Sequence, residues 1–146
     1  AMVRTALRPA QLDVVLDDAI WTDNRYTVGF GVRVSCPSSA DVDRCASLLV
    51  LILEAHPSLR SILEKGNEPG EVWQRAASCA ELSHRVISIQ GKVEQSSGLA
   101  VHSRLARERF ALYGGPLVRM ALEWDESKAM LDIGIVAHHC IPDGQS

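Results

Sequence analysis

Two adjacent histidines near the end of the sequence are the residues best suited to chemistry. His138 and His139 precede Asp143 and Gly144, so the segment reads His-His-x-x-x-Asp-Gly. The unperturbed pKa of histidine, roughly 6.5, lets a neutral imidazole take a proton from a hydroxyl or an amine, as attack on an activated acyl group requires. Asp143 could orient an imidazole or pin the loop to an arginine, and Gly144 permits a tight turn. These residues predict a site for proton transfer, with one histidine as the base.

The same residues allow other interpretations. His138, His139 and Asp143 could bind a metal ion, with Cys140 as a further ligand, as in a metal-dependent hydrolase. Neighbouring strand residues point to opposite faces, so the histidines can share an ion only if the backbone has left the strand. Cys140 beside His139 could form a Cys–His nucleophile pair, although adjacent positions seldom give that geometry. Either histidine could also be a hydrogen-bonded structural residue beside a turn.

Hydrophobic patterning predicts the elements that position these residues. Residues 130–137 have the length and the Ile/Val content of a buried strand, which ends directly before His138. This strand is expected to form a hairpin with 116–124. The other predicted elements are a strand over 26–35, a helix over 41–55 capped by Ser38 or Ser39, a hairpin of 58–65 with 71–75, a short strand over 85–90 and a helix over 99–112. The helix over 41–55 must pack on the sheet through an apolar stripe of Val42, Cys45, Ala46, Leu49, Ile52 and Leu53.

The composition and charge of the chain indicate which classes of protein it can belong to. The chain is 47% hydrophobic and 23% charged, which is typical of a globular domain. A net charge of −3 without a basic run argues against a nucleic-acid interface. The apolar stretches are much shorter than the roughly 20 residues of a membrane-spanning helix, so we expect a cytoplasmic protein. The four cysteines contain no CxxC pair and are expected to be reduced thiols.

The motif at the end of the chain carries a resemblance to a known family. Residues 138–146 resemble the active-site motif of the condensation-domain superfamily, the acyltransferases of nonribosomal peptide synthetases and their chloramphenicol-acetyltransferase-like relatives. Three further segments resemble that family in the same order along the chain. They are Leu7 to Gln11 with its Pro-Ala-Gln element, Glu54 to Arg60 with its His-x-x-Leu-Arg motif, and Gly115 to Arg119 with its Gly-Pro-Leu-apolar-Arg stretch.

This resemblance implies a fold and a domain organisation. The expected fold is α/β, a two-layer sandwich in which a mixed β-sheet carries helices on one face. The family has two similar lobes with the reaction centre between them. We therefore expect residues 1–146 to be the N-terminal lobe, ending just after the motif, with the C-terminal lobe absent. Such a fragment would have little or no activity by itself, and its exposed apolar surface predicts self-association or a partner chain.

The resemblance also implies a reaction. The enzyme would join an acyl group, held as a phosphopantetheine-tethered or coenzyme A thioester, to a small-molecule amine or alcohol in nonribosomal peptide or polyketide biosynthesis. His139 would be the general base or the group that positions the nucleophile, His138 would support the loop, Asp143 would hold the loop and Gly144 would give the backbone room. No tightly bound cofactor and no metal are implied.

The expected partner is an acyl or peptidyl carrier protein. Between 99 and 112 the predicted helix has a charged face formed by Arg104, Arg107, Glu108 and Arg109. We expect this face to be solvated, although it could instead attract an acidic carrier surface. His56 and Arg60 are expected to be structural. Two rivals to the enzyme stay open, a catalytically silent carrier-binding module and the metal-dependent hydrolase.

Overall fold

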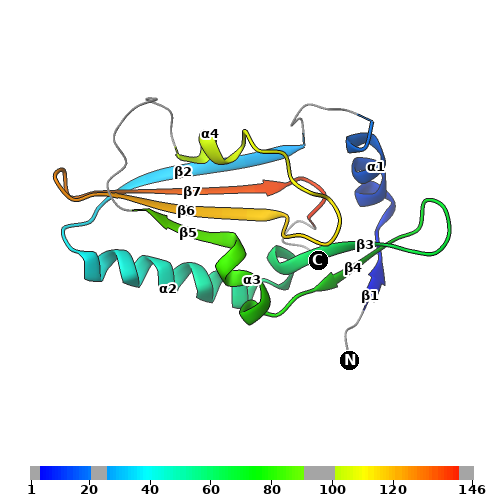
Figure 1. Cartoon of the computed structure of the whole chain (residues 1–146), viewed down its shortest axis with the longest axis horizontal. Helices are drawn as coiled ribbons and strands as arrows, with labels where there is room; N and C mark the ends of the chain where they lie inside the picture. Colours follow the sequence, from blue (N-terminus) through cyan, green and yellow to red (C-terminus); the bar gives the residue numbers. More distant parts are fainter. Residues whose placement is uncertain (1–3, 21–25, 91–100, 142–146) are drawn as a thin grey trace.

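A computed structural model describes residues 4–20, 26–90 and 101–141 of the chain. It contains a four-stranded sheet, a three-stranded sheet and helices that pack on both (Figure 1). In chain order the elements are β1 (Arg4–Ala6), α1 (Pro9–Asp18), β2 (Thr27–Ser35), α2 (Ser39–Ala55), a 3-10 turn η1 (Pro57–Arg60), β3 (Ser61–Lys65), β4 (Val72–Ala76), α3 (Cys79–Val86), β5 (Ile87–Gln90), α4 (Val101–Leu105), β6 (Val118–Asp125) and β7 (Met130–His138).

The larger sheet has the strand order β2-β7-β6-β5 and holds the two histidines at one strand end. β7 pairs antiparallel with β2 and with β6, whereas β5 is parallel to β6, so the sheet is mixed. β7 is therefore bonded on both edges until His138, which lies opposite Thr27. A strand held on both sides is a rigid support for a group at its end.

Helix α2 covers one face of this sheet, over β6 and β5. The Ser38 side chain accepts a hydrogen bond from the Asp41 backbone N–H and so caps the helix at its start. Strand residues two apart share a face, so the apolar residues of the strands lie on one side of the sheet. There they pack against the apolar stripe of α2 and form one core. Its buried members are Cys36, Val42, Leu49, Leu53, Ile62, Ala77, Leu82, Val86, Val118, Met120, Leu122 and Leu131.

Helix α4 lies on the opposite face of the sheet, across β7, β6 and β2 (Figure 1). Its close approach depends on two glycines, Gly31 and Gly134, which are paired across β2 and β7. A Cβ atom on Gly31 would lie 2.6 Å from His102 Nδ1, and one on Gly134 would overlap the Val101 side chain. The glycines therefore make room for the helix.

The smaller sheet has the order β1-β4-β3 and is antiparallel throughout. Together with α1 it forms a second core beside the C-terminal end of β7. Its buried members are Val15, Leu63, Val72, Phe110, Leu117, Val136 and Cys140. This core brings α1 to the end of β7, where the histidines lie.

The α/β class expected from the sequence is confirmed, and so are the strands that became β2, β6 and β7 and the helix that became α2. The sequence predicted one sheet with helices on one face, whereas the structure has two sheets, and α4 lies on the face opposite α2. The predicted apolar stripe of α2 is also correct except at Ile52, which is 39% exposed.

Three boundaries differ from the predictions. The expected strand over 85–90 begins at Ile87, because α3 continues through Val86. Arg60 lies in the 3-10 turn before β3 and not in the strand. The expected helix over 99–112 is helical only over Val101–Leu105 within the described residues. Beyond it the Arg119 guanidinium binds the backbone carbonyls of Leu105, Glu108 and Arg109, which gives these acceptors a partner outside a helix.

No helix in the described part of the chain is long and apolar enough to cross a membrane.

Candidate functional site

His138 is the last residue of β7, and its side chain points into the protein. Its side chain is 3% exposed. Its backbone N–H donates to the Leu117 carbonyl at 2.9 Å, and its Nδ1 accepts a hydrogen bond from the Cys140 backbone N–H at 3.1 Å. The rings of Phe110 and Tyr26 lie 6.2 and 6.3 Å from the imidazole, centroid to centroid. The first histidine is thus held from several directions.

An ion pair between a buried carboxylate, Asp18, and a partly exposed arginine, Arg109, lies against this imidazole. Asp18, the last residue of α1, places Oδ1 3.5 Å from His138 Nε2 and accepts at Oδ2 from Arg109 Nη2 at 3.0 Å. Arg109 Nη2 also donates to the Asp18 carbonyl, at 2.6 Å. Burial lowers the pKa of His138, as do the charges of Arg109 and His139, while Asp18 opposes the shift. Burial prevails, so His138 is neutral at neutral pH.

His139 has the opposite environment. It is exposed, and its backbone N–H donates to the Tyr26 carbonyl at 2.7 Å. One histidine is therefore buried, and the next presents its imidazole to solvent at the strand end. This arrangement argues against a metal ion shared by the two rings.

Cys140, the residue after His139, is buried at 1% exposure. Burial raises the pKa of its thiol to about 12. The reactive form of cysteine is the thiolate, so a thiol of this pKa is inert near neutral pH. A Cys–His nucleophile pair does not fit this position, and all four cysteines are free.

Comparison with known proteins identifies the fold. Cyclosporin synthetase simA of Tolypocladium inflatum is 31% identical over 136 residues, which are 92% of this chain and 1% of that protein. The starter condensation domain of rhizomide synthetase RzmA superposes with a TM-score of 0.71 at 18% identity, over 98% of this chain and 35% of that one. A four-domain nonribosomal peptide synthetase bound to AMP and glycine gives a TM-score of 0.74 at 16% identity, over 98% of this chain and 11% of that one.

The chain has a condensation-domain fold. The resemblance noted in the sequence is therefore confirmed. The tallysomycin biosynthesis protein TlmII shares the fold as well, with a TM-score of 0.71 at 17% identity over 98% of this chain and 35% of that one. The chain spans about a third of the starter condensation domain and a very small part of the curated synthetase. No protein-family model matches the sequence.

Two of the segments that resemble condensation domains meet the histidine motif in space. Gln11 Nε2 donates to the Cys140 carbonyl at 3.0 Å, and the Leu117 carbonyl receives the His138 N–H. The third segment does not reach the motif. Arg60 instead donates to the backbone carbonyls of Leu53, Glu54 and Ala77, where it ties the end of α2 to the chain after β4. A structural role for Arg60 agrees with these contacts.

Asp143 and Gly144, the other two expected site residues of this condensation-domain fold, lie outside the described residues. Within 4–20, 26–90 and 101–141, no group of three His, Cys, Asp or Glu side chains is placed to hold a metal ion. The roles of Asp143 and Gly144 remain predictions from the motif.

The charged face expected over 99–112 is not a merely solvated surface. Arg104 pairs with Glu123 of β6, and Arg109 pairs with buried Asp18. Both arginines therefore have partners within the fold. Neither contact was expected from the sequence, because the partners are distant along the chain.

Three residues of the site were missed by the sequence analysis, namely Gln11, Asp18 and Arg109. A signal for two of them was present. Gln11, Val15 and Asp18 are the buried residues of α1, and their spacing puts them on one helix face. Polar residues on the buried stripe of a helix need partners, and this requirement points to a site.

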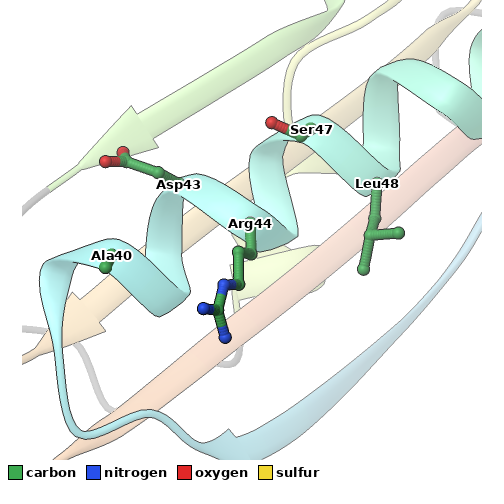
Figure 2. Close-up of a pocket in the computed structure, with 5 residues that line it drawn as sticks. All are labelled: Ala40, Asp43, Arg44, Ser47 and Leu48. Atoms are coloured by element: carbon green, nitrogen blue, oxygen red, sulfur yellow. The ribbon is translucent and has the colours of Figure 1, made fainter.

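An open hollow elsewhere on the surface has no connection with the histidines. It is lined by Ala40, Asp43, Arg44, Ser47 and Leu48. All five belong to the N-terminal half of α2, as Figure 2 shows. That half lies at the opposite end of the sheet from the end of β7 (Figure 1).

Proposed function

We propose that residues 1–146 are the N-terminal lobe of a condensation-type acyltransferase, and that a second lobe completes the active site. The observation that carries the proposal is the position of His139. Its imidazole is exposed at the end of a doubly paired strand, in a chain with a condensation-domain fold. The 31% identity with a peptide synthetase over 92% of the chain adds support.

In the proposed reaction the amine or alcohol of the acceptor attacks the carbonyl carbon of an acyl thioester. The new C–N or C–O bond forms, the C–S bond breaks, and the thiol leaves. His139 accepts the proton that the nucleophile loses, or positions that nucleophile, and the leaving thiolate recovers a proton. Asp143 holds the loop in place, and Gly144 leaves room for the substrate arm. The product is an amide or an ester.

The proposed donor is a thioester on phosphopantetheine or coenzyme A, and the proposed partner is an acyl or peptidyl carrier protein. A mutant of the starter condensation domain of RzmA was solved in complex with C8-CoA, which supports this substrate class. Because a second lobe would contribute the other wall of the substrate tunnel, we expect the 146-residue chain alone to have little or no transferase activity.

The test uses the full-length protein that we propose contains this chain. A carrier-bound acyl thioester is offered with amine and alcohol acceptors, and the products are identified by mass spectrometry for the unmodified protein, His139→Ala and His84→Ala. His84 is an exposed histidine of α3 and serves as the matched control. We expect product from the unmodified protein and from His84→Ala only. Carrier binding without product in all three proteins would support a silent binding module instead.

A further inference from the structure

We propose that Asp18 is a positioning residue that orients the His138 imidazole and thereby fixes the backbone that presents His139. The contacts of Asp18 are features of the fold and do not depend on any function. Its effect on acyl transfer rests on the function proposed above.

The tautomer of His138 follows from its contacts. A nitrogen that accepts a hydrogen bond carries no proton, and His138 Nδ1 accepts from the Cys140 N–H. In the neutral ring the single proton must then be on Nε2, the atom that faces Asp18 Oδ1 at 3.5 Å. This separation is at the outer limit of a hydrogen bond, and Nε2 has no partner that meets stricter geometry. Asp18 is the acceptor available to it.

Asp18 is itself held in place. Its side chain is 5% exposed, and a buried carboxylate is stable only with a partner. Arg109 supplies that partner by binding both the Asp18 carboxylate and the Asp18 backbone carbonyl. The contacts therefore form a series: Arg109 binds Asp18, Asp18 faces His138, and His138 accepts from the Cys140 N–H.

These contacts converge on the peptide groups around His139. The N–H of His139 is bound by the Tyr26 carbonyl, and the N–H of the next residue, Cys140, is bound by His138. The Tyr26 hydroxyl in turn hydrogen-bonds to Asp17, the neighbour of Asp18. The end of α1 thus supports the backbone on both sides of the exposed imidazole. An ion pair that served stability alone would not need to meet this strand end.

The first test is spectroscopic and uses the 146-residue chain labelled with 15N at histidine. Long-range 1H–15N correlation spectra report which ring nitrogen of each histidine carries the proton, and His138→Gln assigns the signal. We expect a single Nε2–H tautomer for His138, and a mixture of tautomers with faster Nε2 proton exchange in Asp18→Ala. Asp18→Asn keeps an oxygen acceptor and should lie between the two. The exposed carboxylate Asp13 of the same helix provides the control Asp13→Ala, which should match the unmodified chain.

The second test measures acyl transfer in the full-length enzyme. We expect Asp18→Ala to lower kcat by about tenfold to a hundredfold, the effect of misplacing a reacting group. KM should change by less than about twofold, since misplacement of the base need not weaken substrate binding. Asp18→Asn should recover part of the loss, and Asp13→Ala should show none.

Two results would overturn the proposal. One is a His138 ring protonated on Nδ1 in the unmodified chain, which does not depend on the folding of any variant. The other is a folded Asp18→Ala protein whose His138 spectrum and kcat equal those of Asp13→Ala. If His139→Ala is fully active, the acyl-transfer proposal fails, but the His138 spectra still decide the role of Asp18.

Discussion

At the scale of single residues, the two histidines of the motif have opposite environments. Strand alternation predicted this difference, because neighbouring side chains of a strand point to opposite faces. The buried histidine, His138, lies against Asp18, which pairs with Arg109, and these last two residues are 91 positions apart and meet only in the folded chain. Hydrophobic patterning does not report such pairs, since it describes one element at a time. The candidate base could therefore be found in the sequence, whereas the pairing of Asp18 with Arg109 could not.

Burial of Cys140 leads to a prediction about reactivity. Its thiol has a pKa of about 12 and should react slowly with iodoacetamide at pH 8, since alkylation requires the thiolate. Cys45 and Cys79 are partly exposed and should react first. Mass spectrometry of peptides after timed alkylation measures the order. Modification of Cys140 ahead of both partly exposed thiols would contradict its placement.

At the scale of elements, local patterns predicted the strands well and the short helices poorly. The strand that became β7 was predicted from its length and its Ile/Val content, and it forms a hairpin with β6, which is close to it in the sequence. Helix α3 was missed although its start carries a signal, since Ser78 accepts from the Glu81 N–H and the sequence reads Ser-x-x-Glu. Helix α4 was predicted too long because the arginine that binds the following carbonyls comes from β6.

The close contact of α4 with the sheet predicts sensitivity at Gly134. A Cβ there would overlap the Val101 side chain and lie 2.9 Å from the His102 backbone N. We expect Gly134→Ala to lower the free energy of unfolding by about 1–3 kcal/mol, as overpacking does. Gly115→Ala is the control, because its Cβ would meet nothing closer than 3.7 Å. Urea denaturation should give a lower free energy of unfolding for Gly134→Ala than for Gly115→Ala. Equal free energies would contradict the close packing of α4 on the sheet.

The capped start of α2 gives a second prediction at this scale. Ser38→Ala removes the acceptor for the Asp41 N–H and should cost about 1 kcal/mol of stability. Ser47→Ala changes a serine within the same helix, where no cap is lost. The difference between the midpoints of their thermal transitions measures the contribution of the cap. A Ser38→Ala protein as stable as Ser47→Ala would show that the cap contributes nothing.

At the scale of the whole molecule, the β2 edge of one apolar sheet face is left uncovered. Val28, Phe30, Val32 and Val34 of β2 lie on the α2 side, opposite Ala137, Ile135, Ile133 and Leu131 of β7, but α2 lies over β6 and β5. Phe30 is 60% exposed. The strand that became β2 was predicted from the sequence. Its exposure depends on where the helix crosses the sheet, which no local pattern specifies.

This uncovered face predicts self-association of the isolated chain, because contiguous exposed apolar surface associates in water. Light scattering after size-exclusion chromatography should show a mass that increases with concentration. Phe30→Ser should reduce the association, whereas Ile89→Ser, an exposed apolar residue of β5 at the other edge, should not. A stable monomer at all concentrations would rule this out.

The proposed role of His139 in acyl transfer is tested most directly by a single-turnover rate. The full-length enzyme is mixed with a preloaded acyl carrier and an acceptor, and the rate of product formation is compared between His139→Ala and His84→Ala. General-base catalysis is worth about a hundredfold or more, so His139→Ala should be slower by at least that factor while His84→Ala keeps the unmodified rate. Equal rates for the two variants would contradict the assignment of His139 to the reaction centre.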